Sequence, residues 1–407
     1  MKTKFTLLAL AVGATLATPA ALAQSTVQLY GKLYPYFLNE SGSGATATGT
    51  PVASMAAAAK GVNGIQEING MMGGKNSRWG LKGSEDLGDG MKAVFQLEGT
   101  APVDTGNNGG TLFGRNTFVG LDGNFGHLKL GNMDTIFKSY GDILGVLGLS
   151  SGSYMGTSSI LRTTGFNNGN ATFHLRAANS FQYESPEMGG FTVGLQYAPG
   201  DQATFEAAKT ATRNPYLVSL GAQYENGPWL LGAAYETHKD FFGGSGSMAT
   251  GITNLTDQLV HSNDTASYIN AVYTVAKGHK LEFNVTRKNY DENATVTGRF
   301  SNYTNTAYIL VAEDRWNSKW TTTVQYAAAN AGSCSLVNTA VCSTSGMNGN
   351  KWVLAAKYDL SKRTSLFAAA GRETNGTSAR YSNTEFGGKP NAGEDISHYD
   401  MGISHSF

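Results

Sequence analysis

Charged residues are scarce in this chain. Only 15% of its 407 residues are charged, whereas soluble globular proteins usually carry about 25%. The 30 basic and 30 acidic residues balance, which argues against a nucleic-acid-binding protein with its basic excess. The 2 cysteines are too few for a disulfide scaffold or a zinc cluster. Beyond the N-terminal segment, no apolar run approaches the ~20 residues that a transmembrane helix needs, so a helical membrane protein is excluded as well.

The N-terminal segment, residues 1–23, has the three parts of a secretory signal peptide. Two lysines lie within its first four residues, an apolar stretch follows, and the small-x-small sequence ALA at residues 21–23 marks the expected cleavage site. A buried N-terminal helix, the alternative, would show polar residues at helical spacing. We therefore expect export of the chain, with residues 24–407 forming one mature domain.

Glycine and aromatic residues are abundant, with 52 Gly, 19 Tyr and 19 Phe. Apolar and polar residues alternate along the chain with a period of two, which is the signature of strands with two different faces. In one segment, Phe191, Val193 and Leu195 share a face opposite Thr192 and Gln196. The alternation recurs in residues 27–33, 91–98, 229–235, 281–286 and 399–407. Strands of this kind build membrane-spanning barrels, in which one face meets lipid and the other meets water.

The connections between these strands alternate between short and long. Tight turns with typical turn residues occur at residues 87–90, 123–126, 187–190, 226–228, 277–279 and 361–363, with a less clear one at 314–318. Longer polar segments lie at about 39–75, 101–111, 135–173, 200–213, 238–264, 291–302, 329–348 and 374–395. Eight loops and seven turns predict an all-β fold, a sixteen-stranded antiparallel transmembrane β-barrel, with both termini on the turn side.

A soluble β-sandwich is the competing fold, because its strands alternate too. Aromatic residues near the ends of the strands, such as Tyr36, Tyr183 and Tyr358, are instead typical of the girdles at membrane interfaces. Together with the expected export signal, they favour the barrel.

Six short motifs are distributed along the mature chain. They are SRWGLKGSEDLG at residues 77–88, LFGR at 112–115, FVGL at 118–121, YESP at 183–186, YDLSKRT at 358–364 and GISHSF at 402–407. Together they resemble the Gram-negative general porins of beta-proteobacteria, in which the first motif reads SRWGLRGSEDLG. The long Gly/Ala/Ser-rich first loop departs from the family pattern, which bears on the shape of the pore mouth.

The resemblance implies a homotrimeric sixteen-stranded outer-membrane porin whose third long loop folds into the pore. It also implies that the second long loop, about 101–111, leans onto a neighbouring subunit. The expected surroundings are outer-membrane lipid and lipopolysaccharide, and the expected solutes are small hydrophilic molecules and anions. Neither a cofactor nor a nucleic acid is expected.

Three arginines are candidates for the pore constriction. Alternation puts Arg78 and Arg176 on the polar face of their strands, in water rather than in lipid, where an arginine costs about 2–4 kcal/mol at mid-depth. Alternation is ambiguous around Arg115; here the resemblance implies that arginines at all three positions cluster on the wall facing the inner loop. Such a cluster attracts anions, whereas the alternative is a set of solvated wall residues without a role in selectivity. Further basic residues expected to face the lumen are Lys32, Lys82 and Lys92.

The third long segment, residues 135–173, is too long for an ordinary hairpin loop, and loops of this length are usually functional or disordered. Its apolar run ILGVLGL at residues 143–149 favours packing inside the barrel. Asp134 and Asp142 are then candidate acceptors opposite the arginines and complete the predicted constriction. The alternative is that both are exposed loop charges.

The two cysteines, Cys334 and Cys342, lie in a polar stretch rich in Gly, Ser and Asn. Because export permits disulfides, we expect a bridge that closes a loop; two free thiols are the alternative. No histidine nearby supports a metal site.

Phe407 ends the final predicted strand. A terminal aromatic residue resembles the signal that the outer-membrane assembly machinery reads in this family. The alternative is simple packing in the lipid-interface girdle, where burial of the ring contributes about 1.5–3 kcal/mol.

An enzyme and a specific transporter are the competing functions. The 7 histidines are scattered without a Ser or Asp partner at a recognisable spacing, and no nucleophile motif stands in a strand-to-helix setting. Energy-coupled transporters carry a plug before a larger barrel, whereas the first strand here is expected close to the cleavage site. A sugar-specific channel would need aromatic residues in the lumen, for which only Tyr30 and Tyr34 have suggestive parity. We therefore predict passive diffusion with a mild anion preference, and no catalytic site.

Overall fold

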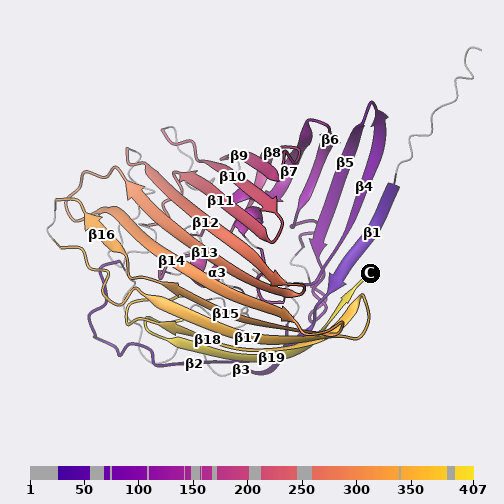
Figure 1. Ribbon diagram of the computed structural model, residues 1–407. Helices are drawn as coiled ribbons and strands as arrows, with labels where there is room; N and C mark the ends of the chain where they lie inside the picture. Colours follow the sequence, from indigo (N-terminus) through magenta and orange to yellow (C-terminus); the bar gives the residue numbers. More distant parts are fainter. Residues whose placement is uncertain are drawn as a thin grey trace, which may run out of the picture.

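One antiparallel sheet closes on itself into a barrel (Figure 1). The computed structural model describes residues 26–55, 68–73, 76–107, 110–141, 143–147, 156, 158–166, 172–200, 212–244, 259–338, 341–382 and 390–407. The sheet contains 19 strand segments, which combine into 16 barrel strands. The predicted signal peptide lies outside the described residues and stays a prediction.

The strand segments vary from 4 to 16 residues in length. They are β1 Thr26–Leu33, β2 Tyr36–Ser43, β3 Ile68–Gly73, β4 Arg78–Gly88, β5 Met91–Thr100, β6 Thr117–Gly123, β7 Gly126–Asp134, β8 Arg176–Glu184, β9 Phe191–Pro199, β10 Tyr216–Asn226, β11 Trp229–Lys239, β12 Ser262–Ala276, β13 His279–Glu292, β14 Phe300–Arg315, β15 Trp320–Ala329, β16 Ser333–Leu336, β17 Gly349–Asp359, β18 Thr364–Asn375 and β19 Asp395–Ser406. Two short helices are α2 Ile136–Gly141 and α3 Ser158–Leu161. Within the described ranges, no helix is long and apolar enough to span a membrane.

Three of the barrel strands are interrupted. β1 and β2 form one strand, because both pair with β19, the first at Lys32 and the second from Tyr36 onward. Pro35 lies in the break between them, where its missing N–H removes a donor from the ladder. In the same way β3 and β4 pair with β2 and β1, and β15 and β16 both pair with β14. The prediction of sixteen strands is confirmed, including the least clear turn, which connects β14 and β15.

Short turns gather at one end of the barrel and long connections at the other (Figure 1); we call these the turn end and the loop end. In the β4–β5 turn, Gly88, Asp89 and Gly90 have φ values of 85°, 51° and 77°, a left-handed path that Gly and Asp adopt most readily. The first long connection begins after Ser43 rather than at residue 39, because β2 continues the sheet. β12, β13 and β14 have 15, 14 and 16 residues, more than the ~9–11 that cross a membrane.

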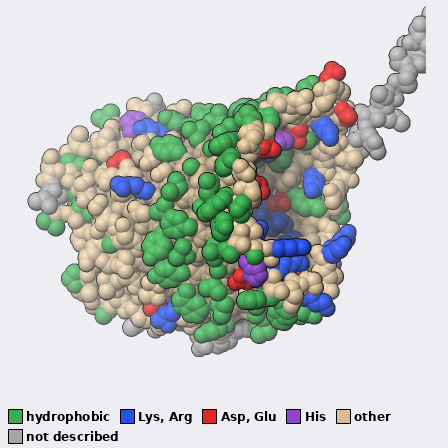
Figure 2. Space-filling view, in the orientation of Figure 1, with side chains coloured by type: hydrophobic (Ala, Val, Ile, Leu, Met, Phe, Trp, Pro, Cys, Tyr) green, Lys and Arg blue, Asp and Glu red, His purple; other side chains and the backbone are tan. Residues whose placement is uncertain are grey.

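The two faces of the wall differ as the alternation predicts. Outward side chains are apolar and exposed, for example Leu29 at 57% and Met401 at 66%. Figure 2 shows hydrophobic side chains gathered in a band across the middle of the visible outer face. Many inward side chains are polar, and Gln196, Glu236 and Asn284 are fully buried. The outer band suits lipid, and the inner face suits water and packed polar groups.

The first and last strands close the barrel, as predicted. Gly31 and Phe407 exchange two backbone hydrogen bonds, each with an N···O distance of 3.1 Å, and the C-terminus lies beside β1 (Figure 1). The Phe407 ring lies so close to Gly31 that an added Cβ would be 2.4 Å from it. Its part-exposed ring is compatible with girdle packing, and its role as an assembly signal stays a prediction.

The third long connection folds into the lumen. α2 packs against β9, β10 and β11, and α3 packs against β14, β15 and β17. Between the helices, Val146 and Leu147 join an apolar cluster with Tyr34, Val353 and Phe367 on the barrel wall. The apolar run predicted to pack inside the barrel therefore does so over its described residues, 143–147.

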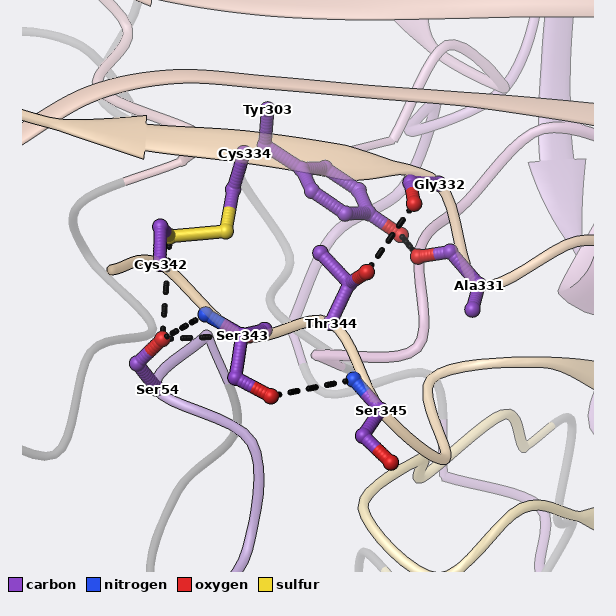
Figure 3. The surroundings of a disulfide bond; sticks show 9 residues. All are labelled: Ser54, Tyr303, Ala331, Gly332, Cys334, Cys342, Ser343, Thr344 and Ser345. Carbon is purple, nitrogen blue, oxygen red and sulfur yellow. Dashed lines mark hydrogen bonds between the residues drawn. A yellow bond between two sulfur atoms is a disulfide. The ribbon is translucent and has the colours of Figure 1, made fainter. Parts of the chain in front are cut away.

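Contacts between long connections hold the loop end together. A disulfide joins Cys334 and Cys342, whose Cα atoms are 5.6 Å apart. Beside it, Ser54 of the first loop accepts a hydrogen bond from the Ser343 N–H at 2.7 Å and donates one to the Ser343 carbonyl oxygen at 3.1 Å (Figure 3). Ser378, between β18 and β19, accepts a bond at 2.8 Å from the N–H of the residue before Ser54. The disulfide thus lies where three connections meet.

We expect loss of this disulfide to loosen the loop end and leave the barrel assembled. Replacing Cys334 and Cys342 by Ser removes the constraint on a short loop, worth about 2–3 kcal/mol in the chain-entropy account. The measurement is limited proteolysis of the first and seventh loops, with heat-resistant migration in gel electrophoresis as the test of the barrel. A reducing agent should reproduce the effect in the wild type and add nothing to the double variant. Equal protease resistance with and without the bridge would contradict the expectation.

Candidate pore constriction

The three predicted arginines lie along one side of the lumen, in the part of the wall formed by β4 to β8. Arg78 begins β4, Arg115 lies just before β6, and Arg176 begins β8; we call these three side chains the arginine wall. The ambiguous parity of Arg115 has a structural reason, because β6 begins only at Thr117 and the preceding residues are not in a strand. Period-two alternation therefore does not govern that side chain.

A buried glutamate on β5, Glu98, lies between two of these arginines. Its Oε1 atom lies 2.6 Å from Arg115 Nε, and its Oε2 atom lies 3.7 Å from Arg78 Nε. The Tyr30 hydroxyl donates a hydrogen bond to Oε2 at 3.0 Å. The Glu98 side chain is only 8% exposed, so these attractions are less screened than on an open surface. Sequence reasoning missed this role: alternation gives Glu98 lumen parity, but the register that pairs it with Gly80 decides its neighbours.

Arg176 has a carboxylate partner of its own. Its Nη2 atom lies 2.9 Å from Asp134 Oδ1, and its Nε donates to Asn116 Oδ1 at 2.9 Å. Asp134 also pairs with Lys138, at 2.7 Å. Because β7 continues to Asp134 and pairs there with Arg176, this acid lies beside the arginine on the same wall, not opposite it. Asp142, the other predicted acceptor, lies outside the described residues.

The predicted lumen lysines extend this basic side. Lys32 lies directly across from Arg78 in the β1–β4 pairing, with its Nζ atom 5.0 Å from the centre of the Tyr34 ring. Lys82 Nζ lies 5.2 Å from the centre of the Tyr30 ring. Lys92 lies near the turn end of β5 and is exposed. Lys32 and Lys82 thus adjoin the arginine wall, whereas Lys92 is farther along the lumen.

Tyr30 and Tyr34, the two aromatic residues that a sugar-specific channel would use in the lumen, have other contacts. Tyr30 donates its hydroxyl to Glu98. Tyr34 is only 2% exposed and stacks on Phe367 with ring centres 4.3 Å apart. A sugar-specific channel needs aromatic rings whose faces are open to the lumen, so that sugars can stack on them. Tyr30 and Tyr34 therefore give no support to such a channel.

The third loop is fixed to the wall opposite the arginines by polar bonds. The Phe137 N–H at the start of α2 donates to Ser219 Oγ at 2.8 Å, and the Asn270 side chain donates to the Tyr140 carbonyl oxygen at 3.0 Å. Farther along, the Leu144 N–H donates to Glu282 at 3.0 Å. The loop therefore follows the inner wall over these strands, and it meets the arginine wall where Lys138 pairs with Asp134.

Buried Arg162 joins the two arms of this loop. Its Nη2 atom donates to the Gly141 carbonyl oxygen at 2.9 Å. The guanidinium carbon lies 4.8 Å from the centre of the Phe137 ring and 4.6 Å from that of Tyr268. These cation–π contacts are favourable for a desolvated guanidinium, so Arg162 stabilises the loop against the wall.

Two glycines of the wall make room for α2. A Cβ on Gly194 would lie 2.6 Å from Ile136 Cδ1, and one on Gly221 would lie 2.8 Å from Ile136 Cγ2 and 2.9 Å from Tyr140 Cδ2. Such distances are too short for carbon atoms in contact. The position of α2 in the lumen therefore depends on the absence of side chains at both residues.

The arrangement of charged side chains in the constriction is suited to attracting anions. Cationic groups line one side of the lumen, and the acids Glu98 and Asp134 pair with them and hold their geometry. Among the described residues, no three His, Cys, Asp or Glu side chains are placed to hold a metal ion. The fixed guanidinium groups offer several N–H donors each to a passing anion.

Known proteins share both sequence and fold with this chain. A family model for Gram-negative porins matches residues 7–378. Outer membrane porin protein 32 of Delftia acidovorans is 35% identical over 247 residues, which cover 59% of this chain and 62%, less than two thirds, of that protein. Major outer membrane protein P.IB of Neisseria lactamica is 30% identical over 299 residues, covering 72% and 76% of the two chains.

Solved structures agree on the barrel. An anion-selective porin from Comamonas acidovorans aligns with a TM-score of 0.70 at 23% identity, over 94% of this chain and all of that one. The trimer form of OmpT of Vibrio cholerae aligns with a TM-score of 0.61 at 15% identity, over 94% and 99%. At these identities the likeness shows the shared fold.

We expect side chains at the two glycines to displace α2. Replacing Gly194 and Gly221 by Val crowds the helix and costs about 1–3 kcal/mol per site where the neighbours cannot relax. The displaced helix should lower the single-channel conductance while the barrel remains heat-resistant. Ala222→Val, one residue along β10 on the lipid face, is the control and should leave the conductance unchanged. A double variant with wild-type conductance would show that the loop position does not depend on these glycines.

Proposed function

Because the chain belongs to the Gram-negative porin family, we propose that it is a water-filled outer-membrane channel through which small hydrophilic solutes diffuse passively, with a preference for anions. The observation that carries the anion preference is the arginine wall, which lines the lumen on the side left open by the third loop. The proposal involves no catalytic step, no cofactor and no input of energy.

The charges at the opening support this preference. Arg78 and Arg115 share one carboxylate, Glu98, and Lys32 lies across from Arg78. Lys82 lies over the ring of Tyr30, whose hydroxyl donates to Glu98. The local charge is therefore positive, although the whole chain has no net charge. A narrow lumen with low-dielectric walls concentrates the field of such groups and raises the local concentration of anions.

We also propose that the protein works as a homotrimer in outer-membrane lipid and lipopolysaccharide. Val103 and Leu112, on the second long connection, are 41% and 54% exposed, a surface that a neighbouring subunit would cover. A trimer is the form of one solved protein with this fold. Residues 1–23 would direct export, and Phe407 would serve assembly.

Replacing Arg78, Arg115 and Arg176 together by Gln should shift the channel toward cations. The change removes the positive groups and leaves the acids Glu98 and Asp134 without these partners. We expect the permeability ratio of chloride to potassium to fall by about tenfold. Clefts lined by charge of one sign raise the local concentration of counter-ions by about 10- to 1,000-fold, and this is the lower end of that range. The measurement is the reversal potential in a planar bilayer under a KCl gradient. An unchanged reversal potential in an assembled triple variant would exclude the arginine wall as the selectivity filter.

Replacing Glu98 by Gln should act in the opposite direction. The neutral amide keeps the size of the side chain but no longer offsets the charges of Arg78 and Arg115, so the preference for anions should rise. Glu225→Gln, at the exposed turn end of β10, is the matched control and should leave the reversal potential unchanged. A shift toward cations in Glu98→Gln would mean that the carboxylate acts mainly by holding the arginines in position.

A further inference from the structure

A small pocket lies at the turn end, where the third loop meets the β17–β18 turn. Its volume is about 180 Å³, and Leu147 of the third loop forms part of its wall. Five Ser and Thr residues and a single carboxylate, Asp359, line it. The other lining residues are the aromatic pair Tyr34 and Phe367 and four cationic residues, namely Lys32, Lys357, Lys362 and Arg363. We call this the turn-end pocket.

The cationic side chains of the pocket exceed their carboxylate partners. Lys357 Nζ lies 3.5 Å from Asp359 Oδ1, and the other oxygen of that carboxylate already faces an arginine at 3.9 Å. Within the described part of the chain, no carboxylate lies within 4 Å of the cationic groups of Lys32, Lys362 or Arg363. Like charges gathered around one small space repel each other, and a bound anion removes that repulsion.

Hydroxyl groups add neutral donors to the same space. Ser361 Oγ accepts hydrogen bonds from the N–H groups of Arg363 and Thr364, both at 3.1 Å. These bonds occupy its lone pairs and leave its proton for another acceptor. Ser365 and Ser404 also line the pocket. A group of cations and O–H donors with few acceptors complements an oxyanion, which carries several acceptor oxygens.

The pocket continues the basic side of the lumen. Lys32 lies across from Arg78 on one side and across from Ser406 on the other, so it connects the arginine wall with the pocket. A neighbouring hollow of about 330 Å³ shares Leu147 and Lys357 and adds Lys280, Arg315 and one carboxylate, Glu313. Figure 2 shows the barrel hollowed at this end, with several Lys and Arg side chains and fewer Asp, Glu and His side chains around the opening.

We propose that the turn-end pocket binds compact oxyanions with two or more negative charges, such as phosphate and pyrophosphate, and that a bound oxyanion partly blocks the chloride current. The small volume favours such ions over drug-sized ligands, whose sites measure about 300–1,000 Å³. The current readout rests on the proposed channel function, whereas the binding itself does not.

The test is single-channel recording in KCl with pyrophosphate added to one side of the bilayer and then to the other. Pyrophosphate should lower the conductance saturably, and more strongly from one side, because the pocket lies at one end of the lumen. In Lys357→Gln/Arg363→Gln, the half-blocking concentration should rise about tenfold or more, since charge-assisted hydrogen bonds are lost. Lys319→Gln, at the same end beside Tyr358 but outside the pocket, should behave like the wild type.

Block of equal strength from both sides, or an unchanged half-blocking concentration in the double variant, would overturn the proposal. If the double variant does not assemble, Arg363→Gln alone changes only an exposed turn residue and gives the same comparison. Titration calorimetry of the detergent-solubilised protein with pyrophosphate measures binding without any current. Failure of the proposed anion preference appears separately, as an unchanged reversal potential in the arginine variants.

Discussion

Backbone hydrogen bonding in lipid is the constraint on which the rest of this structure depends. Hydrocarbon offers no partner to an N–H or C=O group, so a sheet that crosses it must leave no open edge. The pairing of Gly31 with Phe407 completes that closure. Once the sheet is closed, each strand has one face in lipid and one in the lumen, which explains both the period-two sequence and the low content of charge. Within the membrane, charged side chains are tolerated on the face toward the lumen and are destabilising on the face toward lipid.

Closure also explains how distant residues form one site. Arg78, Glu98 and Arg176 are far apart in sequence but lie on β4, β5 and β8, and Arg115 lies just before β6. The β4–β5 register brings Glu98 near Arg78, and the β7–β8 register pairs Asp134 with Arg176. A backbone hydrogen bond from the Arg115 N–H to the Glu98 carbonyl oxygen places the third arginine beside the same acid. The helices of the third loop are anchored on the wall formed by β9 to β17. The two sides of the constriction meet at Asp134, which pairs with Arg176 on the wall and with Lys138 of α2. Glu98 and Asp134 fix the positions of the arginines on one side. On the other side, Arg162 and the room left by Gly194 and Gly221 fix the position of α2.

The sequence was sufficient for features that depend on local periodicity. Strand number, turn positions, closure and the inward third loop followed from alternation, turn residues and the family motifs. Alternation did not place Arg115, because its segment is not a strand. The expected inward third loop put Asp134 opposite the arginines, whereas β7 continues to Asp134 and carries it beside Arg176. Alternation places Glu98 on the lumen side, as observed, but it does not identify the two arginines with which Glu98 pairs. Cross-strand register depends on the whole sheet, so which cation meets which acid could not be read from spacing alone.

The length of the central strands has a consequence for the membrane surface. The 16 residues of β14 span roughly 54 Å along the strand at about 3.4 Å per residue, or roughly 41 Å in height at a tilt of about 40°, against an apolar band of about 25 Å. Because the opposite end finishes in tight turns, most of the excess stands on the loop side as a collar of paired strands. We expect lipid head groups there to surround paired strands, and the loop closed by the Cys334–Cys342 disulfide to lie above the bilayer surface.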